Sequence, residues 1–276
     1  MSEQASEVDR PRVTLERPAR RRSPGWIPNQ HGAWAMLASP LLVGILAAGP
    51  AWAHLPLTLF WFVGYFAFFA AGLWLKASRR ARHRPPVLAY GAAAAMLGVI
   101  VVLVEPRLIR WVPAFVVPLA VGLWSSARRT DRSLLSGLST SMGSALMTLV
   151  AYDAGGGTDW RRAGLLAATQ AAYFAGTVFY VKSLIRQRGD ASFRRLSISC
   201  HVGFAVLAAA AVVLGTRTRA TDIGHLGVSW WVVAVFGVLA VRAAWVPRLT
   251  PPPRPARIGL GEIAATLAVA VTSLAA

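Results

Sequence analysis

Nine long apolar runs, separated by short polar segments, make up most of this 276-residue chain. A transmembrane helix needs about 20 mostly apolar residues, within a range of about 17 to 25. The runs therefore predict an all-α fold, a polytopic membrane helix bundle of about nine transmembrane helices within residues 28–276. The expected spans are 33–49, 56–75, 87–104, 111–127, 134–152, 163–185, 198–214, 228–246 and 258–275.

Composition agrees with a membrane location. Hydrophobic residues form 55% of the chain and charged residues only 14%, whereas soluble domains carry about 25% charged residues. In a soluble protein a formal net charge of +18 would suggest a nucleic-acid partner. In a chain made of apolar spans the basic residues instead lie in the loops, so no nucleic-acid partner is expected. The single cysteine and the spacing of the histidines give no metal site, and no cofactor is expected.

The distribution of Lys and Arg predicts the orientation. On the N-terminal side of the spans the connecting segments and the tail hold 22 of these residues, and on the opposite side the loops hold 6. Cations are retained on the cytoplasmic side during insertion. We therefore expect a multi-pass protein of the cytoplasmic membrane with its N-terminus inside and, because nine is odd, its C-terminus outside.

Residues 1–27 differ in composition from the rest. They mix acidic residues, prolines and the run Arg20-Arg21-Arg22. This composition predicts a disordered basic cytosolic tail. Its arginines serve as a topology signal or contact anionic lipid headgroups.

A short internal repeat ends the second and sixth expected spans. The strings Trp74-Leu75-Lys76-Ala77-Ser78-Arg79-Arg80-Ala81-Arg82 and Tyr180-Val181-Lys182-Ser183-Leu184-Ile185-Arg186-Gln187-Arg188 share an aromatic, an aliphatic, a Lys and two Arg positions. In a helix, Lys at i and Arg at i+4 share one face. Two readings stay open: ordinary basic helix ends, or a clamp in which Lys76, Arg80, Lys182 and Arg186 bind one phosphate.

Polar side chains also form stripes inside two spans. In the sixth, Gln170, Tyr173, Thr177 and Tyr180 lie on one face running toward Lys182, and Gln170, Tyr173 and Tyr180 are candidates to line a ligand entrance. In the fifth, the stripe consists of small residues and indicates close helix packing; its members are Ser136, Thr140, Ser144 and Thr148.

Arg242 and Glu262 are expected at similar depths on the last two expected spans. Each is about 6 Å deep at 1.5 Å per residue, which predicts a salt bridge between them. His31 and His201 are expected near the same cytoplasmic mouth, where they are candidates for a general acid or base.

The entry to the first span is a distinctive string, Pro28-Asn29-Gln30-His31-Gly32-Ala33-Trp34-Ala35-Met36-Leu37, with Pro40 beyond it. It resembles the YwiC-like family of bacterial membrane proteins, in which an Asn-Gln-His-Gly-Ala-Trp sequence opens the first span. The resemblance implies a bacterial membrane protein and indicates no reaction. Asn29 and His31 in this string are predicted as further ligand contacts.

The expected architecture also resembles the UbiA superfamily of intramembrane prenyltransferases. In that superfamily the loops after helices 2 and 6 carry Asp-rich motifs that hold magnesium against a prenyl diphosphate. Here the first loop has no acid and the second has only Asp190. Since magnesium needs carboxylate ligands, the usual magnesium-dependent transfer is not expected, and an enzyme here would be a prenyltransferase-like transferase without those motifs.

The chain is thus expected to bind an isoprenoid or other anionic lipid phosphate at its cytoplasmic face, directly through Lys and Arg. Two alternatives remain: a small-anion transporter and a non-catalytic membrane scaffold or assembly factor. Against transport stands the expectation that no acidic residue lies near the bilayer midplane.

Overall fold

The computed structural model describes residues 25–28, 31–218, 229–251 and 253–275. Nine α-helices are found in this part of the chain, joined by short loops and 3₁₀ turns. Their bounds are α1 His31–Ala48, α2 His54–Lys76, α3 Arg84–Val104, α4 Val112–Ala127, α5 Leu134–Ala154, α6 Trp160–Ile185, α7 Ala191–Thr218, α8 Trp230–Trp245 and α9 Pro255–Leu274. The 3₁₀ turns are η1 Ala81–His83, η2 Pro106–Trp111 and η4 Val246–Arg248. The predicted tail lies almost wholly outside the described residues.

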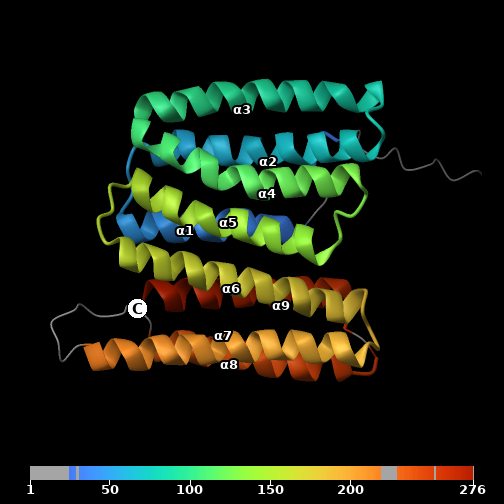
Figure 1. Cartoon of the computed structure of the whole chain (residues 1–276), viewed down its shortest axis with the longest axis vertical. Helices are drawn as coiled ribbons and strands as arrows, with labels where there is room; N and C mark the ends of the chain where they lie inside the picture. The colour runs from blue at the N-terminus through green and yellow to red at the C-terminus, as the bar shows by residue number, and fades with distance from the viewer. Residues whose placement is uncertain (1–24, 29–30, 219–228, 252, 276) are drawn as a thin grey trace, which may run out of the picture.

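The helices lie side by side and run back and forth along one direction (Figure 1). From one edge of the bundle to the other the order is α3, α2, α4, then α1 with α5, α6 with α9, and α7 with α8. Helix α1 begins at one end of the bundle and α9 finishes at the other, as an odd number of spans requires. Connections are short, so consecutive helices are mostly neighbours.

Several helices are longer than the apolar runs. Helix α6 begins at Trp160 because the Asp159 side chain accepts a hydrogen bond from the Arg162 backbone N–H, which caps the first turn. Helix α7 likewise begins at Ala191, behind the Asp190 carboxylate, which accepts hydrogen bonds from the N–H groups of Ser192 and Phe193. Hydropathy marks the part of a helix in lipid, whereas the caps set where the helix begins.

Eight of the described helical segments are long and apolar enough to cross a bilayer, and α1, with 18 residues, is near the lower limit of length. Large apolar side chains cover the outside of the bundle, among them Leu103 and Val117, which are 76% and 67% exposed. Such an apolar surface needs lipid rather than water around it. The chain is therefore an all-α, multi-pass integral membrane protein.

Tryptophans mark both ends of the bundle. Exposed Trp124 and Trp245 lie at the ends of α4 and α8, while Trp52, Trp160 and Trp230 lie at the opposite end. The guanidinium of Arg128 sits 5.9 Å above the Trp124 ring. Tryptophan is enriched at both membrane–water interfaces, so these two girdles bracket the hydrocarbon core.

Helices α1 and α5 pack closely through small residues, as the stripe on α5 predicted. A Cβ on Gly44 would lie 2.4 Å from the Thr148 carbonyl oxygen and 2.7 Å from the Ala151 Cβ. The Ser144 hydroxyl donates to the Met36 carbonyl oxygen across the same interface. On its other sides α5 brings Gly137 against α6 and Gly143 against α4. Small residues let the backbones approach, which is how membrane helices associate without a hydrophobic driving force.

A buried acid ties η2 to α5 at the Trp52 end. The Asp153 side chain is only 3% exposed, and its carboxylate lies 2.6 Å from an Arg110 guanidinium nitrogen. It also accepts a hydrogen bond of 2.7 Å from the Trp111 indole N–H. Arg110 in turn lies 5.1 Å above the Trp160 ring. No pattern in the sequence marks this acid, because Asp153 stands at the end of an apolar run and its partners come from another segment.

Candidate functional site

The opposite end of the bundle, where α2, α4, α6 and α8 finish, holds most of the loop cations and is called the basic end here. Both repeat lysines bind the loop between α4 and α5. The Lys76 ammonium donates to the Asp131 carboxylate at 2.8 Å, and the Lys182 ammonium donates to the carbonyl oxygen of the next residue, Arg132. The two copies of the repeat therefore hold one loop from two sides.

The four repeat cations do not gather around one point. Helices α4 and α5 lie between α2 and α6 in the bundle, and Arg80 and Arg186 are exposed (Figure 1). The shared helical face expected for Lys76 and Arg80 is wrong. Helix α2 ends at Lys76, and Ser78 and Arg79 adopt φ values of 56° and 59°, which turn the chain away from the helix axis. In the second copy Arg186 is the C-cap of α6, and its backbone N–H still bonds the Lys182 carbonyl at 3.0 Å.

The predicted stripe on α6 is buried inside the bundle. Gln170 is fully buried, and its side-chain oxygen accepts a hydrogen bond of 3.1 Å from Ser39 on α1. Tyr173 and Tyr180 are also buried, against α8 and α9. These three side chains thus contact neighbouring helices. Asn29 and the side chain of His31 lie outside the described residues.

The predicted salt bridge between the last two spans is confirmed. Arg242 Nη1 on α8 lies 2.9 Å from Glu262 Oε1 on α9, and the two side chains are 17% and 14% exposed. The other carboxylate oxygen accepts hydrogen bonds from the hydroxyls of Tyr173 and Thr177, at 3.2 and 2.9 Å. The Arg242 guanidinium carbon lies 4.2 Å from the centre of the Tyr180 ring. These five residues are called the Arg242 cluster below.

Glu262 lies farther from the start of its helix than the apolar run suggested. Because α9 begins at Pro255, Glu262 is seven residues into the helix, about 10 Å along its axis at 1.5 Å per residue. Its carboxylate contacts Tyr173, which stands at the middle of α6. The start of a helix does not fix the membrane boundary, so the expectation that no acidic residue lies near the bilayer midplane stays a prediction. An ionisable group inside a membrane helix bundle marks a candidate ligand or proton site.

His201 joins the same region from α7. It is buried, its Nδ1 lies 2.7 Å from the Ser197 carbonyl oxygen, and its ring meets the Tyr180 ring edge-on at 6.4 Å. Whether His31 approaches it stays a prediction. Among the residues that the structure describes, no three His, Cys, Asp or Glu side chains are grouped to hold a metal ion.

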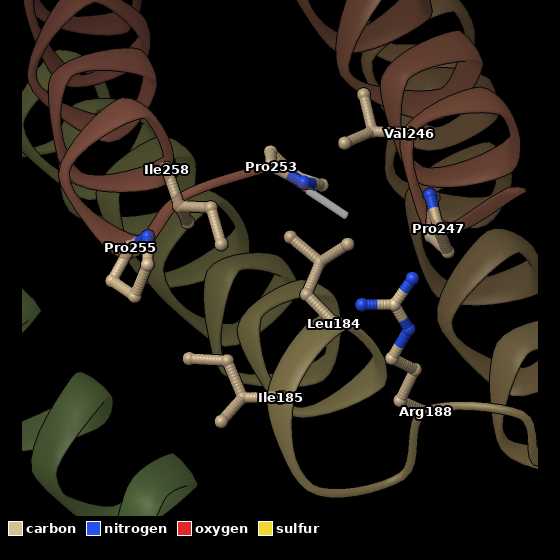
Figure 2. Close-up of a pocket in the computed structure, with 8 residues that line it drawn as sticks. All are labelled: Leu184, Ile185, Arg188, Val246, Pro247, Pro253, Pro255 and Ile258. Carbon is tan, nitrogen blue, oxygen red and sulfur yellow. The ribbon is translucent and has the colours of Figure 1, made fainter. Parts of the chain in front are cut away.

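A pocket of about 250 Å³ opens at the basic end between α6, η4 and the start of α9 (Figure 2). Apolar side chains form its walls, and the Arg188 side chain rises beside Leu184 toward Pro247. None of the predicted ligand contacts that the structure describes lines it. The signal that could have revealed it is the proline-rich stretch 247–255 following a basic helix end. Its lining residues are Leu184, Ile185, Arg188, Val246, Pro247, Pro253, Pro255 and Ile258.

Fold and site together define a multi-pass helical membrane protein with a buried ion pair beneath a basic end. Residues 27–152, which span α1 to most of α5, match the family described as YwiC-like protein. The chain is 33% identical over 177 residues to the uncharacterized protein YwiC of Bacillus subtilis (strain 168), covering 64% of this chain and 74% of that protein. It is 26% identical over 176 residues to an uncharacterized protein of Haemophilus influenzae, with the same coverage.

The chain therefore belongs to the YwiC-like family. No solved structure matches it, so the resemblance to the UbiA arrangement has no structural relative behind it and stays a prediction. The Arg242 cluster and the pocket lie in α6 to α9, beyond the residues that match the family.

Proposed function

We propose that the protein binds an anionic lipid phosphate, such as an isoprenoid phosphate, at its basic end. The observation that supports this most directly is the pocket, which combines apolar walls with the cation Arg188. Its volume of about 250 Å³ is below the roughly 300 to 1,000 Å³ of pockets that enclose small molecules. A site of this size suits part of a lipid chain whose remainder stays in the bilayer.

The headgroup would meet the cations that follow α6. Arg186 and Arg188 are exposed there, and Lys182 uses one of its three ammonium donors on Arg132. A guanidinium binds a phosphate through two parallel N–H groups, which gives direction as well as attraction. Lys76 and Arg80 lie beyond α4 and α5, and Lys76 is paired with Asp131, so these two would act as a separate cationic group.

Lipid binding can be tested by native mass spectrometry of the protein with added farnesyl phosphate. Loss of one charge-assisted phosphate contact costs about 1.5 to 3 kcal/mol, so Arg188→Gln should weaken binding by roughly tenfold or more. Arg195→Gln removes an exposed cation from the same end, away from the pocket, and serves as the matched control. Equal occupancy in Arg188→Gln and the control would contradict the proposal.

The orientation is part of this proposal, with the basic end in the cytoplasm. In a Cys200→Ala background, Gln187→Cys at the basic end should be blocked by a membrane-impermeant maleimide only in inside-out vesicles. Thr158→Cys at the other end should be blocked in intact cells. The reverse pattern would place the basic end outside.

A further inference from the structure

Arg242 has an unused binding edge. Its Nη1 faces Glu262, whereas its Nε and Nη2 are buried and have no hydrogen-bond partner among the described residues. These two nitrogens form the side of the guanidinium that engages a carboxylate or phosphate through two parallel hydrogen bonds. A buried charged donor is unfavourable without an acceptor, so this edge of the guanidinium is suited to bind an added anion.

The pocket lies about one helical turn from this edge, between the end of α6, the turn η4 that follows α8, and the start of α9. Leu184 follows Tyr180 by four residues on α6, and Val246 follows Arg242 by four residues. Ile258 precedes Glu262 by four residues on α9, which runs the other way. Residues four apart lie one above the other on a helix face. Tyr180, Leu184 and Ala243 pack in one cluster with Val246 and Ile258, so these side chains separate the pocket from Arg242.

Charge balance sets the condition for an anion to enter. The Arg242–Glu262 pair is neutral, and one added negative charge would leave an unfavourable net charge in the membrane interior. Glu262 can remove that charge by taking a proton. Among the described residues, the titratable side chains in contact with this pair are Tyr173 and Tyr180 on α6, and His201 on α7 lies against Tyr180. Once protonated, its carboxyl can donate a hydrogen bond to the Thr177 hydroxyl that now donates to it.

We propose that the free edge of Arg242 binds the carboxylate or phosphate group of one small water-soluble anion arriving through the pocket, and that Glu262 takes up one proton from solution as the anion binds. Leu184, Val246 and Ile258 must move aside for entry, so the present arrangement is the closed one. Apart from this proton transfer, no covalent bond forms or breaks. The site is distinct from the proposed lipid headgroup contacts, which use Arg188 rather than Arg242.

A purely structural ion pair predicts different behaviour. Arg242→Lys keeps the positive charge beside Glu262 but removes the two-nitrogen edge, so a structural pair should survive it while an oxyanion site should not. Glu262→Gln should leave the anion site in place and remove only the proton uptake.

The test is isothermal titration of the purified full-length protein with inorganic phosphate and with octanoate, in two buffers of different ionisation enthalpy. We expect saturable binding of at least one of them with uptake of about one proton, at least tenfold weaker binding in Arg242→Lys, and binding without proton uptake in Glu262→Gln. Arg248→Lys, an exposed arginine at the same end that bonds the Ala244 carbonyl, should bind as the wild type does.

Three results would overturn the proposal: no saturable binding of either free anion, equal binding in Arg242→Lys, or proton uptake that persists in Glu262→Gln. If Arg242→Lys does not fold, the neutral pair Arg242→Gln with Glu262→Gln takes its place and must also lose binding. Nanodiscs containing phosphatidylglycerol form the lipid arm. If Arg242→Lys weakens lipid binding while neither free anion binds, the proposal is also overturned. If Arg188→Gln leaves lipid binding unchanged, only the proposed lipid site is contradicted.

Discussion

Replacement of Gly44 by alanine is the sharpest test of how the bundle is packed. The new Cβ would lie 2.4 Å from the Thr148 carbonyl oxygen, 2.7 Å from the Ala151 Cβ and 3.1 Å from the Tyr152 nitrogen. Ordinary contacts between such atoms begin near 3.5 Å, so α1 and α5 must separate by about 1 Å. Two of the three contacts are backbone atoms, which cannot rotate away.

Overpacking of this kind costs about 1 to 3 kcal/mol, and the backbone clash places Gly44→Ala at the upper end of that range. Alanine regains up to about 1 kcal/mol because it favours helix over glycine. We therefore expect a net loss of about 2 kcal/mol, which is roughly a thirtyfold change in the folding equilibrium. The shift also strains the hydrogen bond from Ser144 to the Met36 carbonyl.

The measurement is the unfolding midpoint of the purified protein in detergent, followed by tryptophan fluorescence. Gly64→Ala on α2 is the control, because a Cβ there meets nothing within 4 Å. It should leave stability unchanged or raise it slightly. Equal midpoints for Gly44→Ala and Gly64→Ala would refute the close packing of α1 on α5.

Three further outcomes are expected. Asp153→Asn should destabilise the protein by about 2 kcal/mol, because it removes a buried charge that Arg110 and Trp111 both bind. Glu105→Gln, in the exposed pair with Arg107, should change the unfolding midpoint far less. Equal effects of the two substitutions would count against a stabilising role for the buried Asp153 contacts. Lys76→Ala should hardly change the unfolding midpoint, because the ion pair of Lys76 with Asp131 is partly exposed. It should, however, speed trypsin cleavage in loop 128–133 relative to the control Arg195→Ala. Unchanged cleavage would show that Lys76 does not hold this loop. In a double-mutant cycle on the free energy of unfolding, Ser39→Ala and Gln170→Leu should show a coupling energy of about 0.6 kcal/mol. Additive effects would mean that the hydrogen bond between Ser39 and Gln170 does not contribute to stability.

The cationic repeat shows where sequence reasoning succeeds and where it ends. Its placement at the ends of α2 and α6 follows from hydropathy alone, and both copies do lie at the basic end. Whether they meet depends on the order of helices across the bundle. The structure puts α4 and α5 between them, and it gives each lysine a partner in the loop joining those two helices.

The Arg242–Glu262 pair could be predicted because consecutive antiparallel helices are neighbours and opposite charges inside a membrane usually pair. The pocket could not, since Leu184 on α6 and Pro253 before α9 are about 70 residues apart in the chain. Asp153 likewise gained its partners from η2, a 3₁₀ turn for which the apolar pattern gives no signal.

The sequence by itself determined the spans, the helical class and the basic end. In lipid each backbone N–H and C=O must be satisfied locally, so an apolar run of sufficient length can only be a helix. The tertiary structure alone decided which helices touch and which polar groups meet. Lipid is as apolar as the helix faces, so neighbours are chosen by the fit of small residues such as Gly44 and by scattered hydrogen bonds, and hydropathy records neither.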